Sequence, residues 1–256
     1  MKPTNSAIEP GVICGAVCFV LAILLLGSVA YGNTNLLTDT FDVSQQSYDM
    51  NFQLSTRQSG ALATNGYSWY GYPIHPTVQL DYAGFDNVLM IKANDSSPNP
   101  WVAPNMNFIG YDKLHISYDV HPVVQGGGWG DMPADWGGII LGDAQGPAWL
   151  SSKLVFLVRG NGDTAMFDNL SYAVLPTLTS NITHHIEMDL DKRGTHYYWS
   201  ITGDGVPLLT DHQAQCSIAQ NYVTLIVYGQ GATYVGHTYD NLCFTVPPRG
   251  SVVVFR

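Results

Sequence analysis

The strongest restriction on the fold of this 256-residue chain is a set of short segments in which apolar and polar residues alternate. Lys113–Val120 and His184–Asp191 both follow this pattern. Successive side chains of a β-strand point to opposite faces, so each segment predicts a strand with one buried and one solvated face. From Leu36 onward, no amphipathic run with helical spacing is longer than about two turns. The pattern therefore predicts an all-β fold.

Continuous apolar segments and turn dipeptides predict the layers and connections of that fold. Lys153–Arg159 and Tyr222–Tyr228 are apolar on both sides, as expected for central strands of stacked sheets. Asn161-Gly162 and Asp204-Gly205 are dipeptides that favour tight hairpins. About a dozen short strands predict one two-sheet antiparallel β-sandwich of jelly-roll size over residues 33–246.

Both ends of the chain lie outside this predicted domain. Val12–Tyr31 is an uninterrupted apolar run that ends in small residues, which is typical of an export signal cleaved after Ala30 or Gly32. About 20 apolar residues can also span a bilayer as an uncleaved anchor. Residues 1–32 are therefore predicted to be a signal peptide or a membrane anchor, and residues 247–256 a C-terminal tail. In either case we expect the domain to be secreted or at the cell surface, with a membrane contact only through an uncleaved N-terminal segment.

The charge of the chain bears on its partners. There are 10 Lys and Arg residues against 20 Asp and Glu residues, which gives a formal net charge of −10, and no basic cluster offsets it. Such a chain repels phosphate backbones, so no nucleic-acid partner is expected. With 46% hydrophobic and only 12% charged residues, the chain is also expected to bury a core.

Two cysteines, Cys216 and Cys243, lie outside the apolar N-terminal run. An even number of cysteines in an exported chain predicts a disulfide between them, and closing this loop of about 28 residues would stabilise the fold by about 3 kcal/mol. The alternative is two separate buried thiols. No Cys-x-x-Cys pair indicates zinc or redox chemistry.

Several short motifs occur in an order that resembles a known family. They are Asp39-Thr40-Phe41-Asp42, Trp136–Gly142 (WGGIILG), Leu154–Gly162 and Tyr239-Asp240-Asn241-Leu242. Their order is similar to that of the laminin-G-like, concanavalin A-like jelly-roll domains of exported bacterial proteins. The resemblance implies a two-sheet sandwich whose first and last strands are neighbours. It implies no single activity, because such folds include lectins, glycan-binding modules, adhesion domains and glycosidases.

The same resemblance implies a possible structural calcium ion. It brings Asp39 and Asp42, on the first strand, near Asp240 and Asn241 on the last strand. Carboxylate and amide oxygens are the ligands that calcium prefers. The alternative is that Asp240-Asn241 only caps a turn.

The candidate catalytic residues are the acidic side chains of Glu187-Met188-Asp189-Leu190-Asp191. This segment resembles the strand motif Glu-x-Asp-x-(x)-Glu of concanavalin A-like glycosidases, with Asp191 in place of the last Glu. Retaining hydrolysis needs two carboxyl groups about 5–5.5 Å apart. Residues two apart on a strand are separated by about 6.6 Å, so the spacing is only marginally suitable. The alternative is that these side chains form the solvated face of an amphipathic strand.

Aromatic residues beside acidic ones offer a second kind of site. Tyr70 lies in a segment punctuated by Gly and Pro, and Trp129 lies in a long Gly-rich loop with Asp131 and Asp135. Sugar rings stack their C–H faces on flat aromatic rings, while Asp side chains accept hydrogen bonds from the hydroxyl groups. These four residues are therefore the predicted glycan-binding residues, unless the rings pack into the core.

The sequence as a whole favours an exported, non-catalytic module that binds carbohydrate or mediates cell-surface adhesion. Its expected partner is a glycan or cell-surface polysaccharide, and structural calcium is the one cofactor that the sequence suggests. Two alternatives stay open. One is a glycoside hydrolase that uses Glu187 with Asp189 or Asp191, and the other is a structural envelope or matrix protein without a small ligand.

Overall fold

The computed structural model describes residues 34–41, 69–71, 76–79, 88–93, 101–104, 111–124, 136–142, 154–169, 171–215, 222–228 and 235–247. These residues belong to one compact unit, Thr34–Pro247. All of their regular structure is β-strand, as predicted. In this part of the chain there is no helix long and apolar enough to cross a membrane. The apolar run Val12–Tyr31 lies outside it.

The larger sheet has eight antiparallel strands. Its order is β13 (Val206–Gln213), β12 (His196–Gly203), β11 (His184–Arg193), β6 (Lys113–Val124), β15 (Val235–Val246), β4 (Val88–Ala93) and β3 (Pro76–Gln79), with β1 (Thr34–Asp39) also paired to β15. The edge of β15 that faces away from β6 is shared, because β4 pairs with residues 235–239 and β1 with residues 242–246. The first and last strands are therefore neighbours, as the family resemblance implied.

The smaller sheet has seven antiparallel strands. Its order is β10 (Ser171–Leu175), β9 (Thr164–Asp168), β8 (Leu154–Val158), β7 (Trp136–Gly142), β14 (Tyr222–Tyr228), β5 (Trp101–Pro104) and β2 (Trp69–Gly71). The predicted central strands are β8 and β14. Every residue of β8 is buried, as expected for a strand covered on both faces.

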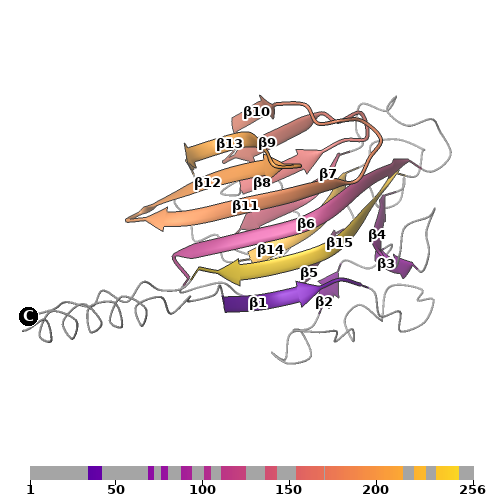
Figure 1. Ribbon diagram of the computed structural model, residues 1–256, viewed down its shortest axis with the longest axis horizontal. Coiled ribbons are helices and arrows are strands. Elements are labelled where there is room, and N and C mark those ends of the chain that lie inside the picture. Colours follow the sequence, from indigo (N-terminus) through magenta and orange to yellow (C-terminus); the bar gives the residue numbers. More distant parts are fainter. Residues whose placement is uncertain are drawn as a thin grey trace, which may run out of the picture. The chain divides into compact units, whose positions relative to one another are not determined.

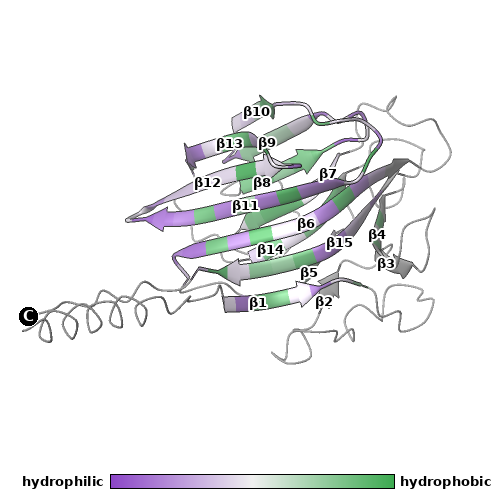
Figure 2. Cartoon of the chain, viewed as in Figure 1, coloured by the Kyte–Doolittle hydropathy of each residue, from purple (hydrophilic) through white to green (hydrophobic). Residues whose placement is uncertain are grey.

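The two sheets pack face to face and bury one core between them (Figure 1). Ile116 and Tyr118 of β6 contribute from the larger sheet, and Ile139 and Phe156 from the smaller. Along β6 and β11 apolar and polar residues alternate (Figure 2), and the apolar ones are buried, so the predicted faces are confirmed. The predicted all-β sandwich is therefore the fold of this domain.

Both predicted hairpins are present. Asn161-Gly162 connects β8 to β9, and Gly162 has φ of 88°. Asp204-Gly205 connects β12 to β13, with φ of 53° and 76°. The two-residue turn between β12 and β13 requires positive φ at both positions, which Asp and Gly tolerate. The β8–β9 connection is longer, over residues 159–163, and within it only Gly162 has a positive φ.

The outer faces of the two sheets differ in character. On the smaller sheet, a second apolar cluster is buried; it consists of Trp101, Ala103, Ile140, Val155, Leu157 and Ile226. On the larger sheet, the outward side chains of β6, β11 and β12 are polar and at least partly exposed over residues 113–119, 185–191 and 198–202. The larger sheet therefore presents the polar surface on which a site can be built.

Candidate functional site

Three adjacent strands of the larger sheet present a continuous set of outward polar side chains. We call this set the polar face; it consists of Lys113, His115, Ser117 and Asp119 on β6, His185, Glu187, Asp189 and Asp191 on β11, and Tyr198, Ser200 and Thr202 on β12. The strand registers arrange them in rows. Asp189 lies between His115 and Ser200, and Glu187 lies between Ser117 and Thr202.

Two histidine–aspartate pairs join β6 and β11. One has its histidine on β6, and the other has its histidine on β11. His115 Nδ1 lies 2.9 Å from Asp189 Oδ1, and His185 Nδ1 lies 2.6 Å from Asp119 Oδ1. The hydrogen bond to Asp189 raises the pKa of His115 above its ordinary value, against the effect of burial. The negative charges of Asp189 and Glu187 raise this pKa further. His115 is therefore an imidazole oriented by a carboxylate that favours its protonated form.

Glu187 lies between these two pairs and stays accessible. Thr202 Oγ1 donates a hydrogen bond of 3.1 Å to Glu187 Oε2, and His185 Nε2 lies 4.0 Å from Oε1. The side chain is 44% exposed. Asp189, two residues further along β11, is 69% exposed. Both carboxylates can therefore accept hydrogen bonds from a ligand on the outer face.

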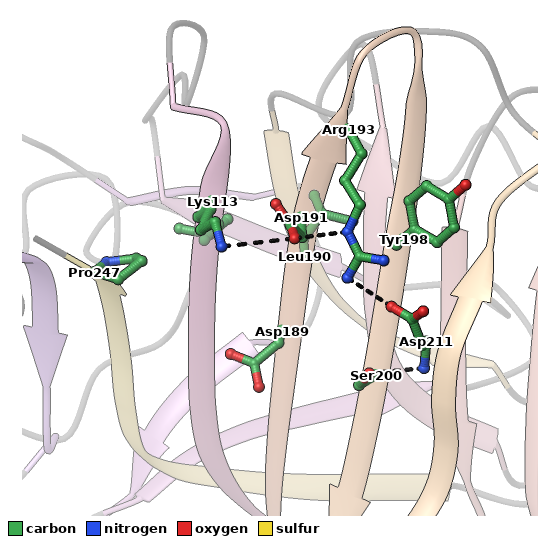
Figure 3. A pocket seen from close by; sticks show the side chains of 10 residues that line it. Lys113, Asp189, Leu190, Asp191, Arg193, Tyr198, Ser200, Asp211 and Pro247 are labelled. Atoms are coloured by element: carbon green, nitrogen blue, oxygen red, sulfur yellow. Dashed lines mark hydrogen bonds and ion pairs between the residues drawn. The ribbon is translucent and has the colours of Figure 1, made fainter. Parts of the chain in front are cut away.

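Arg193 holds the end of the polar face together (Figure 3). Its Nε donates to Asp191 Oδ2 at 2.9 Å, and its Nη2 lies 2.6 Å from Asp211 Oδ1. The guanidinium also stacks 4.4 Å from the centre of the Tyr198 ring, and Lys113 Nζ lies 3.6 Å from Asp191. Arg193 lowers the pKa of Asp211 through their hydrogen bond, so that carboxyl stays ionised.

A pocket of about 240 Å³ opens at this end of the face. Its lining consists of Lys113, Leu114, Asp189, Leu190, Asp191, Arg193, Tyr198, Ser200, Asp211 and Pro247. Asp189 supplies a carboxylate with high exposure, and Tyr198 and Pro247 supply flat or apolar surface. The Ser200 hydroxyl accepts a hydrogen bond of 2.9 Å from the Asp211 backbone N–H, which leaves its own proton to be donated.

The structure brings the three predicted acidic residues onto one face but gives them different surroundings. Asp191 is held by Lys113 and Arg193 in ion pairs, whereas Glu187 and Asp189 are bound mainly to Thr202 and His115. An arrangement of fixed carboxylates, hydroxyls and imidazoles can bind a polyhydroxylated ligand or transfer protons to it.

Comparison with known proteins establishes the fold. No family model and no curated protein sequence matches this chain. Among solved structures, the Emp47p carbohydrate recognition domain aligns with a TM-score of 0.52 and 11% identity, over 87% of this chain and all of that one. Peanut lectin aligns with a TM-score of 0.52 and 9% identity, over 86% and 100% of the two chains. An endo-1,3-beta-glucanase from Streptomyces sioyaensis aligns with a TM-score of 0.52 and 14% identity, over 85% and 98%.

The fold is a concanavalin A-like jelly roll. This confirms the family resemblance drawn from the motifs at the level of the fold. Sequence identities of 9% to 14% support a shared fold and no shared function.

Asp39, Asp240 and Asn241 are the residues of the predicted calcium site that the structure describes, and Asp39 lies opposite Leu242 in the pairing of β1 with β15. Asp39 is 2% exposed, and its Oδ1 accepts a hydrogen bond from the Phe41 backbone N–H. Asp240 Oδ1 accepts one from the backbone N–H of Asn241, which is exposed and whose side chain donates to Asp119. No group of three or more acidic, histidine or cysteine side chains among the described residues is arranged to hold a metal. Asp42 lies outside them, and calcium stays a prediction.

The predicted aromatic site lies largely outside the described residues. Trp129, Asp131 and Asp135 are not among them, and Tyr70 is placed only by its backbone, on β2 opposite Ala103. These four residues stay predicted ligand-binding residues.

Cys243 is a free cysteine in the structure, and Thr38 Oγ1 lies 3.6 Å from its Sγ. Cys216 lies outside the described residues. The predicted Cys216–Cys243 bridge therefore has no support from the structure and stays a prediction.

The partners that surround the acidic residues could not be identified from the sequence pattern. His115 and Asp119 belong to the solvated side of a predicted strand, but only the register between β6 and β11 brings them to Asp189 and His185. Arg193 lies two residues after Asp191, the end of the predicted strand. A strand continued by two residues would place both side chains on the same face, and this spacing was the available signal for Arg193.

Proposed function

We propose that this domain binds a carbohydrate on the polar face, with the pocket beside Asp189 and Tyr198 as the centre of the site. The observation that carries the proposal is the row of outward, hydrogen-bonded polar side chains that ends in this pocket. Proteins of the same fold include one titled a carbohydrate recognition domain, a lectin and an endo-1,3-beta-glucanase. The ligands and substrates in these names support a carbohydrate as the ligand class.

The chemistry of the pocket suits a sugar ring. Sugar hydroxyls need both acceptors and donors, which Asp189 and Ser200 provide. The C–H face of a ring packs against apolar or aromatic surface. Pro247 and Tyr198 line the pocket, with the Arg193 guanidinium stacked on the Tyr198 ring. Arg193 holds Asp191 and Asp211 in place before a ligand binds. Binding therefore costs less side-chain conformational entropy.

The proposed role is that of a glycan-binding or cell-surface adhesion module outside the cytoplasm. The apolar run Val12–Tyr31 supports export, and it is the only segment proposed to contact a membrane. A cell-surface polysaccharide is therefore the proposed partner.

A second candidate function is hydrolysis of a glycan by Glu187 with Asp189. It is favoured by the exposure of both carboxylates on one face, 44% and 69%. His115, oriented by Asp189, adds a group able to transfer protons on the same face. Asp191 is a weaker partner for Glu187, since Lys113 and Arg193 already bind it.

One experiment tests binding and hydrolysis together. The full chain, Asp189→Asn and Glu187→Gln are assayed for retention on, and cleavage of, a panel of polysaccharides. We expect Asp189→Asn to weaken retention about tenfold, since losing a hydrogen bond to a charged group costs about 1.5 kcal/mol. The matched control is Asp163→Asn on the β8–β9 turn of the smaller sheet, which should bind as the unchanged chain does.

The outcomes separate the candidates. Cleavage that Glu187→Gln abolishes would establish the hydrolase. Retention without cleavage, weakened by Asp189→Asn only, supports a binding module. If no polysaccharide is retained, or if Asp189→Asn behaves like Asp163→Asn, the polar face is not a glycan site.

A further inference from the structure

The smaller sheet ends in a regular strand, β10, whose outer edge has no partner strand among the described residues. In the described part of the chain, β10 pairs only with β9, in unbroken register from Ser171 opposite Asp168 to Leu175 opposite Thr164. The unpaired N–H and C=O groups on the edge of a sheet form a template for another strand. Ser171–Leu175 has the sequence SYAVL, with no charge and no proline. The strand therefore lacks the usual features that prevent pairing between molecules.

The other strands that pair on one side only in the described sheets have such features. β1 has an irregular register with β15 between Asn35 and Leu37 and ends in Asp39. β13 contains Pro207 and Asp211, and its register with β12 is broken by irregularities. β3 begins with Pro76, and β2 has only three residues. Prolines, charges, bulges and short length all prevent edge pairing. β10 thus differs from the other end strands in lacking proline, charge and irregular register.

The side chains of β10 also favour association. Tyr172 is 54% exposed and Val174 is 68% exposed, and both point to the same face because they are two residues apart. The Phe167 ring of β9 lies on that face, 5.1 Å from the Tyr172 ring. Large apolar side chains gathered at an open edge are typical of an interaction site.

We propose that two copies of this chain pair through β10, antiparallel and about a two-fold axis at Ala173, so that the two smaller sheets join. In this register Tyr172 of each copy faces Val174 of the other, and Ser171 faces Leu175. Aromatic and β-branched residues form favourable cross-strand pairs. The segment is self-complementary, as a two-fold interface requires. Because it is uncharged, it also brings together two chains of net charge −10 without adding repulsion at the contact.

The mass of the full chain in mild detergent, measured by sedimentation over a range of concentrations, tests this dimer. We expect a dimer for the unchanged chain and a monomer, with half that mass, for Val174→Lys. The matched control is Val206→Lys, which places the same charge on β13 at a residue 55% exposed, and it should stay dimeric. A monomeric unchanged chain, or a Val174→Lys variant that stays dimeric, would overturn the proposal.

A cross-linking variant tests the register. Ala173→Cys places two thiols opposite each other on the proposed axis, so oxidation should link the two chains covalently. Val206→Cys serves as the control and should give no more cross-linking than the unchanged chain, whose own cysteines set the background. If Ala173→Cys and Val206→Cys cross-link equally, the contact does not run through β10.

Discussion

At the scale of single residues, close backbone contact between strands makes Gly138 of β7 irreplaceable. A Cβ atom at this position would lie 2.0 Å from the carbonyl oxygen of Phe156 on β8. Backbone cannot move aside without breaking the β7–β8 ladder, so Gly138→Ala should lower the free energy of unfolding by about 3 kcal/mol. Urea unfolding measures this change. Val206→Ala, at an exposed site, should change stability by no more than about 0.5 kcal/mol; an equal effect at both positions would contradict the packing of β7.

Two histidines of β6 should respond oppositely to pH. Burial, with a smaller contribution from His184, lowers the pKa of His121 to about 4, whereas the hydrogen bond to Asp189 raises the pKa of His115 above 6.5. A group whose pKa falls on folding stabilises the fold at high pH, so the contribution of His121 is lost as pH falls from 6.5 to about 4. The contribution of His115 is complete below pH 6.5 and is lost as pH rises through its folded pKa.

Titration of the imidazole signals by NMR checks this assignment. Asp189→Asn should return the pKa of His115 toward its ordinary value and leave that of His121 unchanged. If the two histidines titrate together near 6.5 in the folded protein, the surroundings assigned to both are wrong.

At the scale of elements, the β12–β13 hairpin depends on Asp204. Its φ of 53° suits Asp or Asn, its Oδ2 lies 2.8 Å from Nδ1 of the buried His184, and its Oδ1 accepts from the His185 backbone N–H. Asp204→Ala should therefore cost about 3 kcal/mol, because it strains the turn and leaves His184 without this partner. Asp204→Asn keeps the turn and one acceptor and should cost about 1 kcal/mol. Chemical denaturation of the two variants compares these costs, and a loss for Asp204→Ala no larger than that for Asp204→Asn would contradict the role given to the turn conformation.

The elements show how far a sequence can predict structure. The hairpins at Asn161-Gly162 and Asp204-Gly205 were predictable because turn chemistry is local. The faces of β6 and β11 were predictable because burial follows a period of two. The pairing of β6 with β11 was not predictable. Four strands of the smaller sheet, β7 to β10, lie between them in the sequence, and tertiary packing sets their register.

At the scale of the whole molecule, the outer faces of the two sheets have different roles. The core between them and the buried cluster on the outer side of the smaller sheet stabilise the jelly roll. The outer side of the larger sheet is left to polar side chains that bind one another in pairs. The acidic segment Glu187–Asp191 was predictable as a candidate site from its motif. The histidines, Arg193 and Tyr198 that complete it came together only through the fold.

The central claim is that a carbohydrate binds on the polar face. Mapping the backbone amides that shift in NMR spectra during titration with a retained oligosaccharide tests it most directly. We predict shifts concentrated in Lys113–Ser117 of β6, Asp189–Arg193 of β11 and Tyr198–Ser200 of β12. Shifts confined to β2 and to the residues around Trp129 would instead contradict this account and place the ligand at the other predicted site.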